Sequence, residues 1–131
     1  MPIHFRDAMS GFSVDDLEAA HKFYGETLGL TTSLNQMGIL DISLPGGGKG
    51  IAYPKTDHQP ATYTCLNLAV DDIDATVDAL IAAGVAMEQY GIPDMKQDAK
   101  GIARGEFGPA IAWFKDPAGN ILSVIQVPAA G

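Results

Sequence analysis

Hydrophobic and polar positions along the chain follow a pattern that occurs twice, 56 residues apart. Residues 12–18 read Phe-Ser-Val-Asp-Asp-Leu-Glu, and residues 68–74 read Leu-Ala-Val-Asp-Asp-Ile-Asp. In both copies alternating apolar residues lead into a pair of aspartates, which is typical of a strand followed by a helix. We expect the first aspartate of each pair, Asp15 and Asp71, to cap its helix, with the acidic residue three positions later suiting the helix dipole.

Apolar residues at steps of three and four follow each aspartate pair, and this spacing predicts an amphipathic helix in each half. Gly29 and Gly84 lie where a left-handed residue would end each helix. The residues expected to form the apolar helix faces are Leu17, Ala20, Phe23, Tyr24 and Leu28 in the first half, and Ile73, Val77, Leu80 and Ile81 in the second.

The remainder of each half is strand-like and is broken by glycine and proline. Each half therefore predicts a βαβββ module, and neither module can bury an apolar sheet face alone. The polar segment 55–60 is the predicted hinge of one α+β domain over 1–131, with module one at about 1–56 and module two at about 61–131. The expected strands after the helices are 30–35, 38–44 and 49–55 in module one and 85–90, 109–115 and 120–127 in module two.

Composition excludes several classes of protein. The chain has 131 residues, of which 47% are hydrophobic, so it can build a real core. Its formal net charge of −8 disfavours nucleic acid as a partner. The apolar runs are too short to span a bilayer, and residues 1–11 lack the apolar stretch of a signal peptide. A single cysteine cannot form an intramolecular disulfide, and we expect a cytoplasmic location.

Three motifs in this order resemble the vicinal oxygen chelate superfamily, which includes glyoxalases, bleomycin-resistance proteins and dioxygenases. The motifs are FSVDDLEAAHKFYGETLGL at 12–30, VDDIDATVDALIAAGV at 70–85 and AWFKDPAGNILSVIQ at 112–126. The segment AYPKTDHQPATYTCLN at 52–67 is similar to an uncharacterised subgroup. The resemblance implies two βαβββ modules that form a half-open barrel around a central cleft, and it makes a homodimer the expected assembly.

Members of this superfamily that are enzymes typically hold a divalent metal through His, Glu or Gln at four inward positions. The resemblance places three of these positions at Met9, Cys65 and Ser123, and the fourth among Ile51, Ala52 and Tyr53. Hard divalent ions need oxygen or imidazole donors, which this set lacks. We therefore expect no cofactor and no metal, although a divalent metal is the superfamily's default.

Strand alternation predicts a mostly apolar cleft with a few neutral hydrogen-bonding groups, which suits a small organic ligand. The same side chains would equally fill the inside of a barrel. Cys65 has no cation beside it in sequence, and this favours a buried, inert thiol over a nucleophile. The candidate cleft residues from this argument are Met9, Tyr53, Cys65, Asn67, Trp113 and Ser123.

Polar segments supply the other candidates. Lys55 and His58 lie in the hinge, where they either contribute to a ligand site or only fix the turn. His4 and His21 fall at no inward position. Cations recur every four residues at Lys96, Lys100 and Arg104 in the stretch 91–108, and they would bind an anion if this stretch covers the cleft as a lid. Otherwise the stretch is an exposed loop.

Three functions remain open at this point. The first is a metal-free protein that binds a small organic molecule in the barrel cleft. The second is a metal-dependent lyase, isomerase or dioxygenase of the same superfamily with atypical ligands, and Met9, Cys65 and Ser123 argue against it. The third is an interaction protein with a vestigial cleft. Fold alone does not decide among them, because one frame hosts many chemistries.

Overall fold

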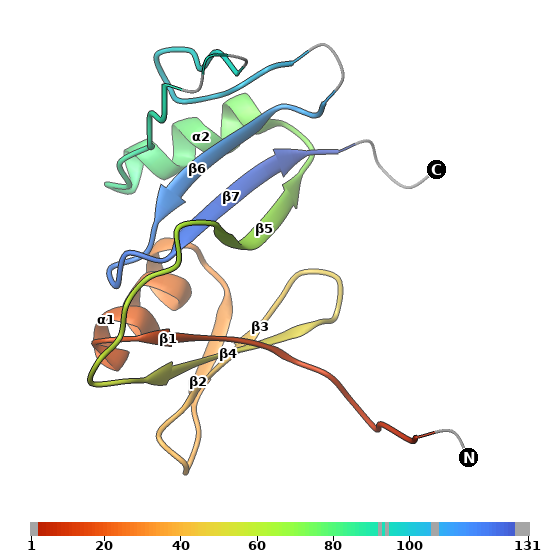
Figure 1. Ribbon diagram of the computed structural model, residues 1–131, viewed down its shortest axis with the longest axis vertical. Coiled ribbons are helices and arrows are strands. Elements are labelled where there is room, and N and C mark those ends of the chain that lie inside the picture. The colour runs from red at the N-terminus through yellow and green to blue at the C-terminus, as the bar shows by residue number, and fades with distance from the viewer. Residues whose placement is uncertain (1–2, 92, 94, 106–107, 128–131) are drawn as a thin grey trace. The chain divides into compact units, whose positions relative to one another are not determined.

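The computed structural model describes residues 3–91, 93, 95–105 and 108–127 (Figure 1). The chain divides into two compact units, Met1–Gln59 and Pro60–Gly131. The boundary between the units lies within the polar segment at 55–60. The half-open barrel, which concerns both units together, and the count of one domain stay predictions.

The first unit contains one mixed sheet and one helical segment. Its four strands occur in the order β1-β4-β3-β2, with β1 parallel to β4 and the other neighbours antiparallel. The first and last strands of the unit are therefore hydrogen-bonded neighbours, and the predicted βαβββ order is confirmed. The elements are β1 (Ser10–Val14), α1 (Leu17–Lys22), η1 (Phe23–Thr27), β2 (Thr31–Leu34), β3 (Leu40–Ser43) and β4 (Lys49–Pro54).

The second unit repeats this plan with one strand fewer. Its sheet has the order β5-β7-β6, with β5 parallel to β7. The prediction of a strand at 85–90 is wrong, since Met87 forms only an isolated bridge to Phe114. The N–H of Glu88 still bonds to β6, but the carbonyl of Glu88 and the N–H of Tyr90 bond to the side chain of Gln97 instead of to a strand. The elements are β5 (Thr64–Val70), α2 (Ile73–Ala82), β6 (Ile111–Lys115) and β7 (Ile121–Gln126).

Both α-helices begin in the same way, which confirms the repeat but moves the predicted cap by one residue. The second aspartate of each pair, Asp16 or Asp72, is the N-cap, and its carboxylate accepts a bond of 3.1 Å from the N–H three residues later. The acidic residues at 18 and 74 favoured the first aspartate of each pair, but the second has the extended backbone and this bond. Gly29 (φ 73°) and Gly84 (φ 91°) are left-handed, as predicted.

The first helical segment changes to π-helical geometry after Lys22. A π-turn advances more residues per turn, and here Phe23 and Tyr24 are both buried, with ring centroids 5.3 Å apart. Leu17 and Leu28, which were expected on this apolar face, are half-buried. The helix was therefore predicted at the right position, but the π-helical geometry of its second part was not predicted.

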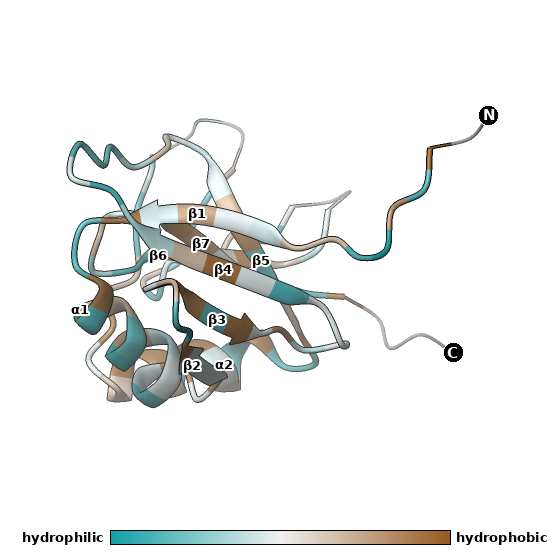
Figure 2. Cartoon of the chain, turned by 90° about the horizontal axis from the view of Figure 1, so that it is seen from below, coloured by the Kyte–Doolittle hydropathy of each residue, from teal (hydrophilic) through white to brown (hydrophobic). Residues whose placement is uncertain are grey.

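Apolar side chains on the helix-facing side of each sheet form the two cores. In Figure 2, β3 and β7 carry hydrophobic residues, whereas much of α1 is hydrophilic. Ile81 is 47% exposed, so its predicted place in the core is wrong. The buried hydrophobic residues are Val14, Ala20, Phe23, Tyr24, Leu40, Ile42 and Ala52 in the first unit, and Ile73, Val77, Leu80, Ile102, Ala103, Ala112, Phe114, Leu122 and Val124 in the second.

The turn between β6 and β7 is built by one buried aspartate. The carboxylate of Asp116 accepts bonds from the N–H of Ala118 (2.9 Å) and Asn120 (2.8 Å), and from the side-chain amide of Asn120 (3.0 Å). Gly119 adopts φ 86° in the same turn. An aspartate that bonds its own following backbone fixes such a turn, so this motif determines how β6 and β7 align.

Candidate ligand-binding site

Strand register places three predicted site residues side by side on the second sheet. Asn67 on β5 and Trp113 on β6 both lie opposite Ser123 on β7. Residues that are paired across strands point to the same face. The alternate positions Leu122 and Val124 are buried and point to the opposite face, on which α2 packs. The row of Asn67, Ser123 and Trp113 therefore belongs to the face away from the helix.

The hydroxyl of Ser123 and the indole N–H of Trp113 in this row both have hydrogen-bond partners. Ser123 is fully buried, and its hydroxyl donates to Oδ1 of Asn67 at 2.5 Å. The indole Nε1–H of Trp113 donates to the hydroxyl of Thr64 at 3.1 Å. Buried polar groups in proteins need such partners, because leaving one unpaired costs about 1–3 kcal/mol. These bonds therefore fix the side chains of the row on the sheet.

A hollow of about 370 Å³ opens beside Trp113 on the same face. The ring of Tyr90 packs edge-on against Trp113, with centroids 5.5 Å apart and an interplanar angle of 68°. Tyr63 is 70% exposed at the rim. Only Trp113 among these residues was predicted from the sequence, in which no local pattern links Tyr63 or Tyr90 to Trp113. The lining residues are Thr62, Tyr63, Thr64, Tyr90, Trp113 and Ile121.

Cys65 occupies an irregular point of β5, where the register shifts between Thr64 and Leu66. The thiol is half-buried. Burial raises its pKa, and the nearby carboxylate of Asp116 raises it further. The thiol is therefore protonated at neutral pH, whereas nucleophiles and metal ligands are thiolates. This environment favours the inert-thiol interpretation.

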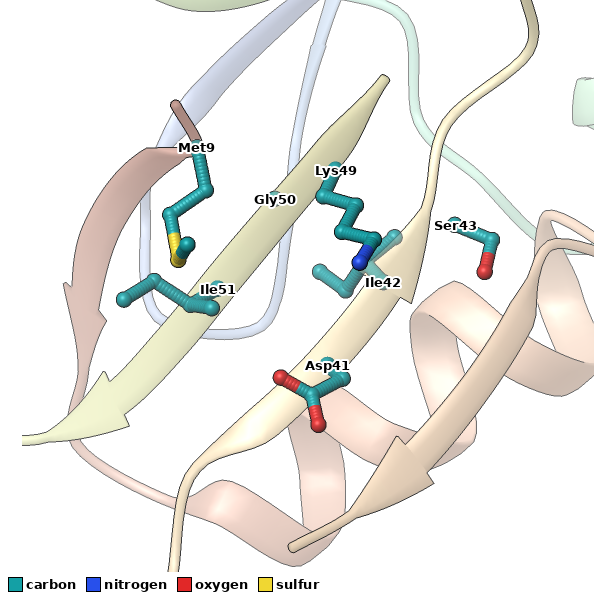
Figure 3. Close-up of a pocket in the computed structure, with 7 residues that line it drawn as sticks. All are labelled: Met9, Asp41, Ile42, Ser43, Lys49, Gly50 and Ile51. Atoms are coloured by element: carbon teal, nitrogen blue, oxygen red, sulfur yellow. The ribbon is translucent and has the colours of Figure 1, made fainter. Parts of the chain in front are cut away.

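The first sheet carries a smaller hollow, of about 230 Å³, at the strand ends near Met9. Figure 3 shows Met9 next to Ile51 on β4, with Lys49 and Asp41 nearby. Met9 is 53% exposed. Gly11 lies opposite Ile51 in the β1–β4 register, just as Asn67 lies opposite Ser123. Ile51 is therefore the counterpart of Ser123 in the first unit.

This register narrows the expected metal-binding positions to Met9, Ile51, Cys65 and Ser123. They offer an exposed thioether, an alkyl group, a protonated thiol and a hydroxyl that already donates to Asn67. Within the described residues, no three His, Cys, Asp or Glu side chains gather closely enough to hold a metal ion. The residues present do not fit a catalytic divalent metal, which needs carboxylate or imidazole donors.

Lys55, Tyr53 and His58 lie at the end of the first unit. Lys55 forms an ion pair with Asp57, and its hydrogen bond lowers the pKa of that carboxyl. The imidazole Nδ1 of His58 shares a hydrogen bond of 2.6 Å with the hydroxyl of Ser13 on β1. Tyr53 is 37% exposed. These contacts tie the 55–58 turn to the sheet of the first unit.

The described part of the stretch 91–108 contacts helix α2. Arg104 donates to Asp74 on α2 at 2.7 Å, and Lys100 pairs with Asp78 one turn later at 2.8 Å. Arg104 also bonds Asp98 at 2.9 Å. The lid hypothesis required these cations on the face with Trp113, so their pairing with α2 favours the exposed-loop alternative. Residues 92, 94, 106 and 107 of this loop lie outside the described residues.

The family model for the Glyoxalase/Bleomycin resistance protein/Dioxygenase superfamily matches residues 4–124. The chain belongs to this superfamily, so the resemblance inferred from its motifs is confirmed, and with it the α+β fold class. Among curated proteins, no relative matches the chain. Within the described residues, none of the helices combines the length and the hydropathy needed to cross a membrane.

Several solved structures are similar to this chain over nearly its whole length. TnmS3, an antibiotic binding protein from a Streptomyces species, is 25% identical, with a TM-score of 0.69 and coverage of 98% of this chain and 99% of that one. A superfamily member from Sphaerobacter thermophilus is 23% identical, with a TM-score of 0.68 and coverage of 95% and 98%. The fosfomycin resistance protein FosX from Listeria monocytogenes is 13% identical, with a TM-score of 0.69 and coverage of 97% of each chain. The last two likenesses concern the fold alone.

Proposed function

We propose that this protein binds a small organic molecule, without a metal, on the sheet face that carries Trp113. The aromatic hollow beside Trp113 is the observation that carries the proposal. Its volume of about 370 Å³ lies in the range of small-molecule sites, roughly 300–1,000 Å³. The similarity to an antibiotic binding protein supports the same class of function.

The lining residues define the chemistry of the ligand. Tyr63, Tyr90 and Trp113 offer aromatic faces and edges, and the hydroxyls of Thr62 and Thr64 offer hydrogen bonds. None of the described lining residues is charged. The ligand that fits is a flat, largely apolar ring system with a polar substituent at its edge.

The phenol of Tyr90 suits this uncharged lining. Burial raises its pKa above the ordinary value, and the charge of Glu88 raises it further. The phenol is therefore protonated at physiological pH, so that it acts as a hydrogen-bonding group and an aromatic surface. A binding function needs no ionised group at this position.

A naphthalene series tests the proposal. Trp113 is the single tryptophan of the chain, so its indole N–H gives one assignable signal in a ¹H–¹⁵N spectrum. Neutral 2-naphthol, anionic 2-naphthoate and cationic 2-naphthylmethylammonium share one ring system and differ in charge. We expect saturable movement of the indole signal with 2-naphthol above all. A signal that stays in place with all three probes at millimolar concentration overturns the proposal.

Two tyrosines of equal exposure provide a matched control. Tyr90 and Tyr53 are each 37% exposed, but only Tyr90 lines the hollow. We expect Tyr90→Ala to weaken 2-naphthol binding at least tenfold, which corresponds to about 1.4 kcal/mol. We expect Tyr53→Ala to leave binding unchanged. Equal losses in the two variants would place the ligand elsewhere.

The absence of a metal from the binding mechanism is tested separately. We expect neither EDTA treatment nor added Zn²⁺ or Mn²⁺ to change the affinity for 2-naphthol. Stoichiometric metal in protein purified without chelators, with binding that EDTA abolishes, would favour the metal-dependent enzyme alternative. The homodimer and the cytoplasmic location stay predictions, and light scattering measures the first of them.

A further inference from the structure

Tyr90 forms one wall of the hollow, but no regular strand holds it in place. The segment before it bonds to β6 at Met87, which bridges Phe114, and at Glu88, whose N–H donates to the carbonyl of Trp113 at 2.9 Å. Beyond Glu88 the segment leaves the sheet. The edge-on contact between Tyr90 and Trp113 must therefore be fixed by other groups.

The side chain of Gln97 supplies these contacts. Its Oε1 accepts from the backbone N–H of Tyr90 at 2.7 Å, and its Nε2 donates to the carbonyls of Glu88 and Gly101, both at 2.8 Å. One amide thus uses its oxygen and both of its N–H groups, which is the most that the two donors allow. These bonds replace the strand ladder that the segment lacks.

Gln97 belongs to a small hairpin that is itself well anchored. Gln97 bridges Ala103, and the carboxylate of Asp98 accepts from the N–H of Lys100 (2.9 Å) and Ile102 (3.0 Å). The salt bridges of Lys100 and Arg104 attach the same hairpin to α2. The hairpin is therefore a fixed support from which Gln97 reaches Tyr90.

We propose that Gln97 is the positioning residue of the aromatic hollow: its amide holds Tyr90 against Trp113 and thereby sets the affinity for a flat ligand. The effect on affinity rests on the proposed function, whereas the placement of Tyr90 does not. Gln97 does not line the hollow and acts through the backbone of its neighbours. Only an amide of this length combines one acceptor with two donors.

The variant Gln97→Glu turns this support into one that depends on pH. A carboxylate faces the carbonyl oxygens of Glu88 and Gly101 without a donor and is repelled, whereas the protonated acid restores one donor. Because both carbonyls disfavour the charged form, its pKa lies above that of an ordinary carboxyl. We expect the indole signal of Trp113 to be displaced at pH 8 and to return toward the wild-type position as the pH falls to 5.

The ligand-free signal is the first readout, because it is independent of any binding function. Gln89→Glu is the matched control, since the side-chain amide of Gln89 donates a bond of 2.8 Å to the carbonyl of Asp98 nearby. We expect its indole signal to follow the wild type at every pH. An indole signal of Gln97→Glu that also follows the wild type, in a folded protein, overturns the positioning role.

Gln97→Met is a second variant, which tests the positioning role even if Gln97→Glu does not fold at high pH. It keeps the side-chain length but has no amide, so we expect an indole signal displaced equally at pH 5 and pH 8. With 2-naphthol as the probe, we expect Gln97→Glu to bind at least tenfold more weakly at pH 8 and to recover at pH 5. If the wild-type protein does not bind the naphthalenes, the proposed function fails. The ligand-free indole signals of the variants still decide the role of Gln97.

Discussion

The same position of the two sheets carries Gly11 opposite Ile51 in the first unit and Asn67 opposite Ser123 in the second. In the first unit an isoleucine covers the glycine, and a Cβ on Gly11 would lie 3.1 Å from its Cγ1. In the second unit a buried hydroxyl bonds a side-chain amide. One backbone frame thus carries an isoleucine over a glycine in the first unit and a bond between a hydroxyl and an amide in the second, and two residues make the difference.

The support of the two faces differs as well. The hollow near Met9 lies on regular strands of the first unit, whereas the hollow near Trp113 has a wall outside the sheet. Tyr90 in that wall depends on side-chain bonds from Gln97. Irregular backbone next to a regular sheet is where binding residues commonly lie. The comparison therefore favours the second unit as the binding unit.

The largest effect on stability is expected from Ser123→Ile, which places the isoleucine of the first unit at the equivalent position of the second. Ser123 is fully buried, so the larger side chain overpacks its site and removes the bond to Asn67. We expect a loss of about 3 kcal/mol in the free energy of unfolding, measured with urea. The reverse change, Ile51→Ser, affects a half-buried residue and should cost about 1 kcal/mol. Equal losses would contradict the comparison.

Alanine substitutions at two turn glycines should lower the free energy of unfolding by smaller amounts, which differ from each other. Gly101 (φ 84°) packs so closely that a Cβ would lie 3.0 Å from the carbonyl oxygen of Glu88, whereas a Cβ on Gly38 (φ 75°) would meet nothing within 4 Å. We expect Gly101→Ala to cost about 2 kcal/mol and Gly38→Ala about 1 kcal/mol, since left-handed backbone alone costs roughly 1–2 kcal/mol. Thermal and urea unfolding measure both. A larger loss in Gly38→Ala would argue against the close approach of the hairpin.

Residues 56 positions apart in the repeat provide the next test. Cys65 is half-buried, and Met9 is 53% exposed. We expect Cys65→Ala to lower the free energy of unfolding by about 1 kcal/mol, because it removes partly buried apolar volume. Met9→Ala should stay within about 0.5 kcal/mol of the wild type. An effect of Met9→Ala as large as that of Cys65→Ala would mean that Met9 is covered in the folded protein.

The smallest expected effect on stability is the loss of the charge of the Asp98 carboxylate at low pH. Burial alone would raise the pKa of Asp98, but bonds from the N–H groups of Ile102 and Lys100 and from Arg104 outweigh it and lower the pKa below 3.8. A lowered folded-state pKa contributes stability that is present above the unfolded value and is lost as the pH falls through the folded one. Because Asp98 is exposed, the contribution is under about 1 kcal/mol.

Urea unfolding between pH 6 and pH 3 measures this contribution. We expect Asp98→Asn to be less stable than the wild type at pH 6, with a gap that narrows below about pH 4. Asp57→Asn is the control from the first unit, where Lys55 lowers the pKa of a fully solvated carboxyl. A constant gap across the range for Asp98→Asn would mean that the carboxylate charge contributes nothing.

Much of the fold was predictable because the repeat carries local signals. Apolar spacing and the glycines at 29 and 84 located both helices, and alternation located the strands. The cap was wrong by one residue, because the acidic residue Glu18 pointed to Asp15, whereas backbone geometry selects Asp16. The missing strand at 85–90 was unpredictable, because the bonds that replace it come from Gln97, a side chain outside any periodic pattern.

The candidate site was predictable only where it follows strand alternation. Asn67, Trp113 and Ser123 were expected on one face, and the register places them there. Tyr63 and Tyr90 were missed, because their approach to Trp113 depends on loops. Lys100 and Arg104 were considered as anion-binding groups of a lid, whereas they pair with Asp78 and Asp74 on α2, and these partners are set by tertiary structure.

The parallel pairing of first and last strands affects the order in which each unit can form during synthesis. A ribosome releases the amino end first, so β1 has no partner strand until β4 has emerged. In the second unit β7 lies between β5 and β6, so neither of them has its partner until the chain reaches Ile121. Sheets that depend on distant pairing form slowly. A nascent chain halted before Ile121 would therefore hold a completed first sheet, but neither the β5–β7 nor the β6–β7 ladder of the second.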